Sequence, residues 1–195
     1  MKLIGFYDYT VILTYLSLLS AVAGMFLASN GRFTAAILCL VLCGICDAFD
    51  GTVARSKKNR TEDEKAFGIQ IDSLCDAVSF GVFPALLCYH MGVDSFAGCV
   101  ILALYALCGV IRLAFFNVLE AKRQQTEGGC NKTYRGLPIT TASIILPLVY
   151  LTRGILPGKT FRTVLHLVMA LTGALFVQDI SVKKVDVSKL VTRSR

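Results

Sequence analysis

Four aspartates fall in two short stretches of this chain, at spacings that suit the faces of helices. Asp47 and Asp50 stand at i and i+3, whereas Gly68, Asp72 and Asp76 stand at i, i+4 and i+8. Each set lies along one face if its segment is helical. Ionised carboxylates that meet repel one another unless divalent cations neutralise them. The pattern therefore predicts two helices that bring Asp47, Asp50, Asp72 and Asp76 together as metal ligands.

The expected ligands are all carboxylate oxygens, which favour Mg²⁺ or Mn²⁺ over zinc. Neither histidine of the chain, His90 or His166, is close in sequence to the aspartates. We expect two ions, because a pair of metals suits a diphosphate group. Together they neutralise its oxygens and the charge that develops on a leaving phosphate.

Residues beside the aspartates fit a phosphate-containing ligand. Gly51, Ala54 and Gly68 have little or no side-chain bulk, so a flat group could approach the helix backbones there. Arg55 could contact phosphate in a bidentate manner. An alternative is that the small residues only allow close helix packing.

The apolar residues that must position this cluster fall in blocks. Of the 195 residues 55% are hydrophobic, and the mean hydropathy is +0.65. Most blocks approach the roughly 20 residues that a helix needs to cross a bilayer. The six blocks are residues 9–27, 33–54, 68–91, 96–119, 136–151 and 161–177. We predict an all-α membrane domain of six transmembrane helices in residues 1–180, followed by a basic tail, 181–195.

The basic residues orient these helices. Fifteen of the 20 lysines and arginines fall on the side of the two termini, against four on the other side. The positive-inside bias places both termini in the cytoplasm, and with them the aspartate cluster. We expect a multi-pass protein of the cell membrane, because no targeting extension precedes the first block. Nucleic-acid binding is not expected, since it needs a basic face on a soluble module.

The spacing of the cluster matches a known pattern. Asp47-x2-Asp50-Gly51-x2-Ala54-Arg55 followed by Gly68-x3-Asp72-x3-Asp76 closely resembles the signature of the CDP-alcohol phosphotransferase family. Twelve residues separate Arg55 from Gly68, which exceeds the commonest family spacing by about one helical turn. The excess lies in a solvent-side loop and should leave the two faces intact.

The resemblance implies a role for each matching position. Asp47, Asp50 and Asp72 would bind the metals, while Asp76 would complete the metal site and act as general base. The residues that would contact the CDP-lipid are Asp50, Gly51, Ala54 and Gly68, with Arg55 on the diphosphate. The implied reaction is displacement of CMP from a CDP-linked lipid by an alcohol. The family also implies a homodimer.

Three further segments indicate the alcohol. Residues 72–85, 112–117 and 136–139 are similar, in order, to phosphatidylserine synthases of the small integral-membrane type. This similarity implies CDP-diacylglycerol and L-serine as substrates, with phosphatidylserine and CMP as products. In an archaeon the lipid would be the ether-linked equivalent.

Serine is a zwitterion, so its site needs a cation and hydrogen-bond acceptors. Arg112 can hold the carboxylate, and the amide carbonyl of Asn117 can help to hold the ammonium group. The predicted topology brings both residues to the depth of the aspartates. Tyr134 and Arg135 are expected at the rim of the same site.

Two alternatives remain. A sister enzyme that uses glycerol 3-phosphate or inositol phosphate needs more than one cation for the acceptor phosphate, and Arg112 and Arg135 could supply them. A divalent-cation channel or transporter could instead line its path with aspartates. The second alternative is disfavoured because all four aspartates are expected near one surface, with no acidic residue deep in the other blocks.

Overall fold

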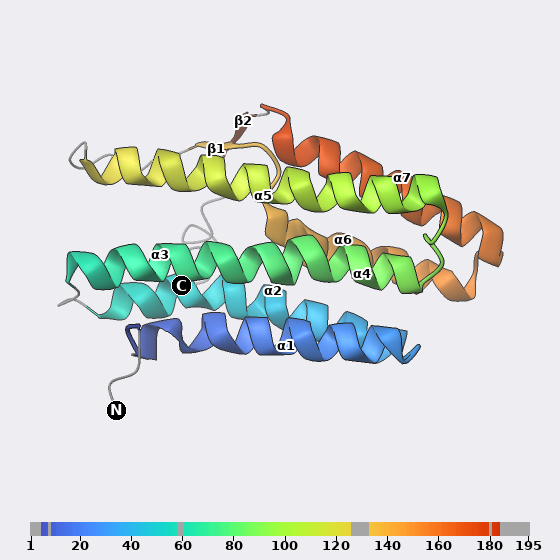
Figure 1. The fold of residues 1–195 in the computed structure, drawn as a ribbon, viewed down its shortest axis with the longest axis horizontal. Coiled ribbons are helices and arrows are strands. Elements are labelled where there is room, and N and C mark those ends of the chain that lie inside the picture. The colour runs from blue at the N-terminus through green and yellow to red at the C-terminus, as the bar shows by residue number, and fades with distance from the viewer. Residues whose placement is uncertain (1–4, 8, 58–60, 126–132, 180, 184–195) are drawn as a thin grey trace, which may run out of the picture.

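The structure is a computed structural model that describes residues 5–7, 9–57, 61–125, 133–179 and 181–183. Within these residues the chain is helical, apart from two short strands. The helices run side by side along the long axis of the molecule (Figure 1). The α-helices are α1 Ile12–Ser29, α2 Phe33–Ser56, α3 Glu62–Asp76, α4 Phe83–His90, α5 Phe96–Gln125, α6 Ala142–Leu151 and α7 Gly158–Val177.

Shorter elements connect the helices. A π-helical turn, Ala77–Val82, joins α3 to α4, so that the two form one continuous rod. Short 3₁₀ turns precede α1 (Tyr9–Val11) and flank α6 (Ile139–Thr141 and Thr152–Gly154). Strands β1, Thr133–Arg135, and β2, Ser181–Lys183, pair in antiparallel fashion, which joins the segment after α5 to the segment after α7.

Five helical stretches of the described chain are long and apolar enough to cross a membrane. They are Tyr9–Ser29, Phe33–Val53, Glu62–His90, Phe96–Ala121 and Gly158–Val177. The remaining predicted span corresponds to a shorter apolar helix, Ile139–Gly154, which contains Pro147. The prediction of a helical protein is confirmed, and five of the predicted blocks form helices of membrane-spanning length.

The third block begins earlier than predicted. The sequence pattern placed its start at Gly68, but the helix begins at Glu62 because Thr61 and Glu64 form a capping box. The Glu64 backbone N–H donates to Thr61 Oγ1 at 3.2 Å, and the Thr61 N–H donates to Glu64 Oε2 at 2.9 Å. Glu64 also pairs with Lys57 Nζ at 3.0 Å, which links the ends of α2 and α3.

Small side chains bring α1 close to its neighbours. Its buried positions lie along one helical face and most are small: Thr14, Ser17, Ser20, Ala21, Gly24 and Ala28. At Gly24 an added Cβ would collide with the ring of Phe83 in α4.

At the end of α1, Asn30 Nδ2 donates to the Phe26 carbonyl at 2.7 Å. Gly31, at φ +72°, allows the tight turn into α2.

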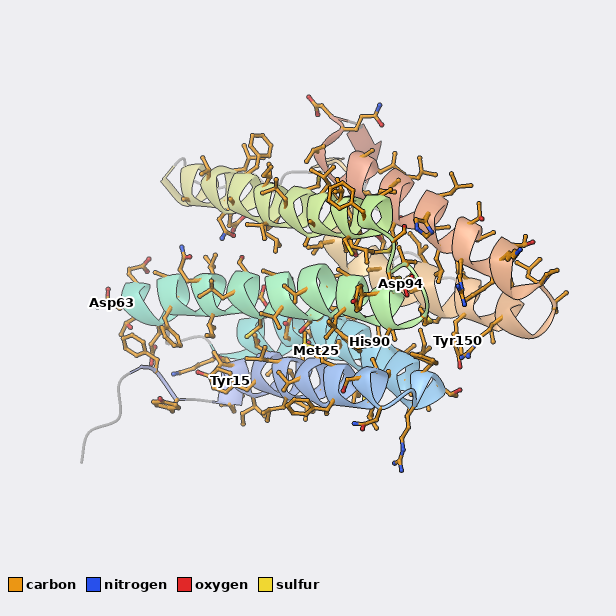
Figure 2. All side chains as sticks on the ribbon, turned by 45° about the vertical axis from the view of Figure 1, so that its right-hand side comes forward. Tyr15, Met25, Asp63, His90, Asp94 and Tyr150 are labelled. Carbon is orange, nitrogen blue, oxygen red and sulfur yellow. The ribbon has the colours of Figure 1, made fainter. Side chains whose placement is uncertain are left out.

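The α3–α4 rod lies between the α1–α2 hairpin and α5 (Figure 1). In Figure 2, Asp63 lies at one end of the molecule, while His90 and Asp94 lie at the opposite end. Because α2 ends and α3 begins at the Asp63 end, both aspartate segments belong to the same half of the molecule.

Candidate functional site

The first part of the site is the last third of α2. Asp47 and Asp50 are half-buried and lie on the same side of this helix. The backbone N–H of Gly51 donates to the Asp50 carboxyl group. The helix continues through Ala54 and Arg55 to Ser56. The whole first half of the signature, Asp47 to Arg55, therefore lies on one helix, as predicted.

The second part of the site is the end of α3. Gly68 and Asp72 are half-buried, whereas Asp76, the last residue of the helix, is only 9% exposed. The helix face that carries Gly68, Asp72 and Asp76 therefore runs from the half-buried middle of α3 into the packed interior. Asp76 stands at the point where α3 passes into the π-helical turn.

The carboxylates of the two helices meet. One carboxylate oxygen from each of Asp47, Asp50 and Asp72 lies within 4.8 Å of the others. The Asp50 and Asp72 carboxyl groups also hydrogen-bond to each other. Asp76 is not one of this group of three, but it interacts electrostatically with all three of its members. The four aspartates thus form one acidic cluster between α2 and α3.

The donor set of this cluster fits a divalent cation. Asp72 Oδ1 is buried and has no hydrogen-bond partner among the described residues. A buried carboxylate oxygen of that kind is costly unless a cation or a donor satisfies it. Three converging carboxylates are the oxygen ligands that Mg²⁺ and Mn²⁺ prefer. Asp47, Asp50 and Asp72 could therefore hold a hard divalent ion.

Arg112 extends the site onto α5. It is 9% exposed, and its positive charge interacts with the Asp76 carboxylate. The residue lies in the apolar middle of a membrane-length helix, where an arginine needs a counter-charge. Its counter-charge comes from another helix, so Arg112 connects α5 to the acidic cluster.

Asn117 lies one turn and a half further along α5 and faces the same rod. Ser73 Oγ donates to Asn117 Oδ1 at 2.8 Å. The sequence predicts that this carbonyl binds the ammonium group of serine, but one of its lone pairs already accepts from Ser73. That bond fixes the orientation of the Asn117 amide, and with it the direction in which its NH₂ group points. Ser73 was missed because nothing in the local pattern of α3 indicates its partner on α5.

The other predicted site residues are placed by their backbones alone. Ala54 and Arg55 lie in the last turns of α2, and their side chains lie outside the described part of the structure. The same holds for Tyr134 and Arg135, which lie on β1. Gly51 is half-buried on α2, next to Asp50.

Strand β1 is held in place by the end of α7. Arg135 pairs with Ser181 of β2, and the Leu137 N–H donates to the Leu175 carbonyl at 3.2 Å. Between them Gly136 has φ +76°, and an added Cβ would lie 3.0 Å from the Phe176 carbonyl oxygen. Only glycine suits this close approach, so the segment that carries the predicted rim residues is fixed through its backbone.

Comparison with known proteins agrees with this geometry. The profile of the CDP-alcohol phosphatidyltransferases matches residues 9–178, a stretch that contains both aspartate segments and α5. The chain belongs to the CDP-alcohol phosphatidyltransferase family. It is thus a multi-pass membrane protein of a metal-dependent enzyme family, and the acidic cluster coincides with the signature that the sequence predicted. No solved structure matches the chain.

The similar family members carry related names. The chain is 35% identical over 175 residues to the archaetidylserine synthase of Methanothermobacter thermautotrophicus, covering 88% of this chain and 69% of that protein. It is 32% identical over 179 residues to the CDP-diacylglycerol–serine O-phosphatidyltransferase of Helicobacter pylori, covering 89% and 71%. The yeast enzyme with that name, from Saccharomyces cerevisiae, is 40% identical over 116 residues, covering 58% and 41%.

Proposed function

We propose that this CDP-alcohol phosphatidyltransferase transfers a phosphatidyl group from CDP-diacylglycerol to L-serine, giving phosphatidylserine and CMP. The observation that carries the proposal is the meeting of the Asp47, Asp50 and Asp72 carboxylates within 4.8 Å of one another. The acceptor is inferred from the names of the similar family members, two of which are serine O-phosphatidyltransferases.

Asp47, Asp50 and Asp72, with Asp76 beside them, would hold Mg²⁺ or Mn²⁺, with two ions expected. The bound ions would neutralise the diphosphate and stabilise the charge on the leaving CMP. Gly51, Ala54 and Gly68 would leave room for the cytidine, and Arg55 would bind the diphosphate.

Asp76 would act as the general base. The serine hydroxyl oxygen forms a bond to the phosphorus that carries the diacylglycerol, and the bond from that phosphorus to the CMP oxygen breaks. The hydroxyl proton passes to the Asp76 carboxylate as the attack proceeds, because a serine hydroxyl has too high a pKa to ionise unaided. The low exposure of Asp76, 9%, limits competition from water.

The acceptor would bind between α3 and α5. Arg112 would pair with the serine carboxylate, and the Asn117 amide, held by Ser73, would make the second polar contact. The interaction between Arg112 and Asp76 supports this assignment because it brings the cation that binds serine next to the base that activates it. Tyr134 and Arg135 would complete the rim.

The membrane arrangement is also part of the proposal. Residues 1–180 would form a domain of six transmembrane helices, with Ile139–Gly154 as the short one and residues 181–195 as a basic tail. Both termini and the active site would face the cytoplasm of the cell membrane, following the bias of lysines and arginines. The working form would be a homodimer.

The experiment that tests the function measures CMP release by the purified protein in detergent with CDP-diacylglycerol and Mn²⁺. We expect release with L-serine and none after EDTA is added. Release with glycerol 3-phosphate or inositol phosphate in place of serine would identify a sister enzyme instead. A parallel reaction with an ether-linked CDP-lipid tests the donor, because one similar protein is an archaetidylserine synthase. Ion flux in vesicles without CMP release would indicate a channel.

A further inference from the structure

The chain leaves α3 at Asp76 through an unusual stretch of helix. The Ala77 N–H donates to the Ser73 carbonyl, four residues back, as in an α-helix. The Phe83 N–H donates instead to the Val78 carbonyl, five residues back. A π-helical turn of this kind accommodates an extra residue, and such turns are frequent at functional sites.

A proline explains why this turn needs outside support. Pro84 has no N–H, so the carbonyl of Phe80, four residues earlier, lacks the donor that an α-helix would supply. Phe80 is fully buried, at 0% exposure, and water cannot serve as the substitute donor. The Tyr105 hydroxyl on α5 donates to this carbonyl at 2.7 Å.

The Tyr105 side chain is held firmly by its surroundings. It is 1% exposed, and its ring packs against the ring of Phe176 on α7 with centroids 5.3 Å apart. Gly173 on α7 lies so close that an added Cβ would be 3.1 Å from Tyr105 Cα. The hydroxyl is therefore presented to the π-helical turn from a packed α5–α7 pair.

Tyr105 and Arg112 are seven residues apart and share one face of α5. Their partners on the rod, Phe80 and Asp76, are four residues apart. The two helices run in opposite directions, so α5 contacts the rod at two successive points, one at the π-helical turn and the other at Asp76 (Figure 1).

We propose that Tyr105 is a positioning residue for Asp76. Its hydroxyl holds the π-helical turn by satisfying the Phe80 carbonyl, and the turn sets how α3 is rotated relative to the packed α4. If the turn lost its extra residue, α3 would rotate relative to α4 by roughly 100°, the angle between successive residues of a helix. The proposal rests on the catalytic role proposed for Asp76, and Tyr105 acts through that residue without touching substrate.

The test compares Tyr105→Phe with the wild-type protein in the CMP-release assay and in thermal unfolding. The variant keeps the ring and loses only the hydroxyl. We expect kcat to fall by about tenfold or more, with the KM values for serine and CDP-diacylglycerol changed by less than about twofold. A misplaced base slows the chemical step, whereas general loosening of the fold would move the KM values as well.

Tyr150→Phe is the matched control. The Tyr150 hydroxyl is hydrogen-bonded to Thr34 Oγ1 at 2.8 Å, and Tyr150 lies near the His90 and Asp94 end of the molecule (Figure 2). Its loss should leave kcat unchanged. An equal fall of kcat in both tyrosine variants would overturn the proposal.

Adding Pro84→Ala to Tyr105→Phe separates positioning from stability. The Pro84→Ala substitution would provide the Phe80 carbonyl with an ordinary α-helical donor, so Tm should recover. The hydroxyl that holds the π-helical turn would still be missing, so kcat should stay low. Pro84→Ala alone, which keeps the hydroxyl that holds the turn, should retain kcat and Tm close to those of the wild-type protein. Recovery of kcat together with Tm, or full kcat in Tyr105→Phe, would overturn the proposal. A wild-type protein that releases no CMP would reject the proposed function itself, and this role with it.

Discussion

The Asp50 carboxyl group on α2 hydrogen-bonds to the Asp72 carboxyl group on α3, although the two residues are 22 positions apart in the chain. Two ionised carboxylates in such contact repel each other unless a proton or a cation lies between them. A divalent cation can take the place of that proton and bind both carboxylates in their ionised forms. A metal bound by this pair would therefore join the two halves of the signature.

Asp50→Asn should separate metal binding from folding. An amide can donate to Asp72 without an added proton, so the variant should fold with a free energy of unfolding within about 1 kcal/mol of wild type. It should lose most of the rise in Tm that MnCl₂ gives the wild-type protein, because a ligand that binds the folded state stabilises it. CMP release should fall by about a hundredfold or more. A variant that keeps both the Mn²⁺-dependent Tm shift and turnover would contradict the assignment of Asp50.

Asp76→Asn should have a different signature. The three carboxylates within 4.8 Å of one another do not include Asp76, so most of the Mn²⁺-dependent Tm shift should remain. Turnover should still fall by about a hundredfold or more, because the amide cannot accept the serine proton. The two measurements on one preparation distinguish the general base from the three carboxylates that converge on the metal. Retained kcat in this variant would remove Asp76 from the chemical step.

Arg112→Ala should weaken serine binding more than binding of the CDP-lipid. Removing one charged partner of a hydrogen-bonded pair costs about 2 kcal/mol or more, or at least about thirtyfold in the KM for serine. Arg112→Lys keeps the charge but not the planar fork, and it should give an intermediate KM. An unchanged serine titration in the alanine variant would reject the role of Arg112 in the acceptor site.

Ser73→Ala should affect the acceptor site through Asn117. Loss of one hydrogen bond is worth about 1 kcal/mol, so the KM for serine should rise by about fivefold while the Mn²⁺ titration stays unchanged. Ser20→Ala serves as the control, since Ser20 Oγ on α1 donates at 3.1 Å to the Cys39 carbonyl on α2. If both alanine variants raise the KM equally, the Ser73–Asn117 bond has no specific role.

Local patterns predicted the helices and the acidic cluster well. Asp47 and Asp50 lie on a helix whose apolar residues are readable from the sequence, and the same is true of Asp72 and Asp76. Their convergence could be inferred because two antiparallel helices joined by a short loop bring their ends together. The start of α3 was placed too late because the block was recognised by its apolar residues, and the charged residues after Thr61 belong to the helix but not to the apolar block.

Contacts between distant helices were not predictable in the same way. Neither the Ser73–Asn117 bond nor the Tyr105–Phe80 bond leaves a local signal, because each depends on how α5 packs against the rod. The π-helical turn was missed although Pro84 was visible in the sequence. A proline near the start of α4 is also compatible with an ordinary kink, and the buried hydroxyl that supports the turn comes from α5.

An anomalous difference map from crystals of the protein grown with MnCl₂ would show directly whether the aspartates of α2 and α3 bind a metal. We predict a peak bounded by the carboxylates of Asp47, Asp50 and Asp72. If the enzyme is active with Mn²⁺ but the map shows no peak there, or a peak only at other residues, the metal site is not formed by these three aspartates.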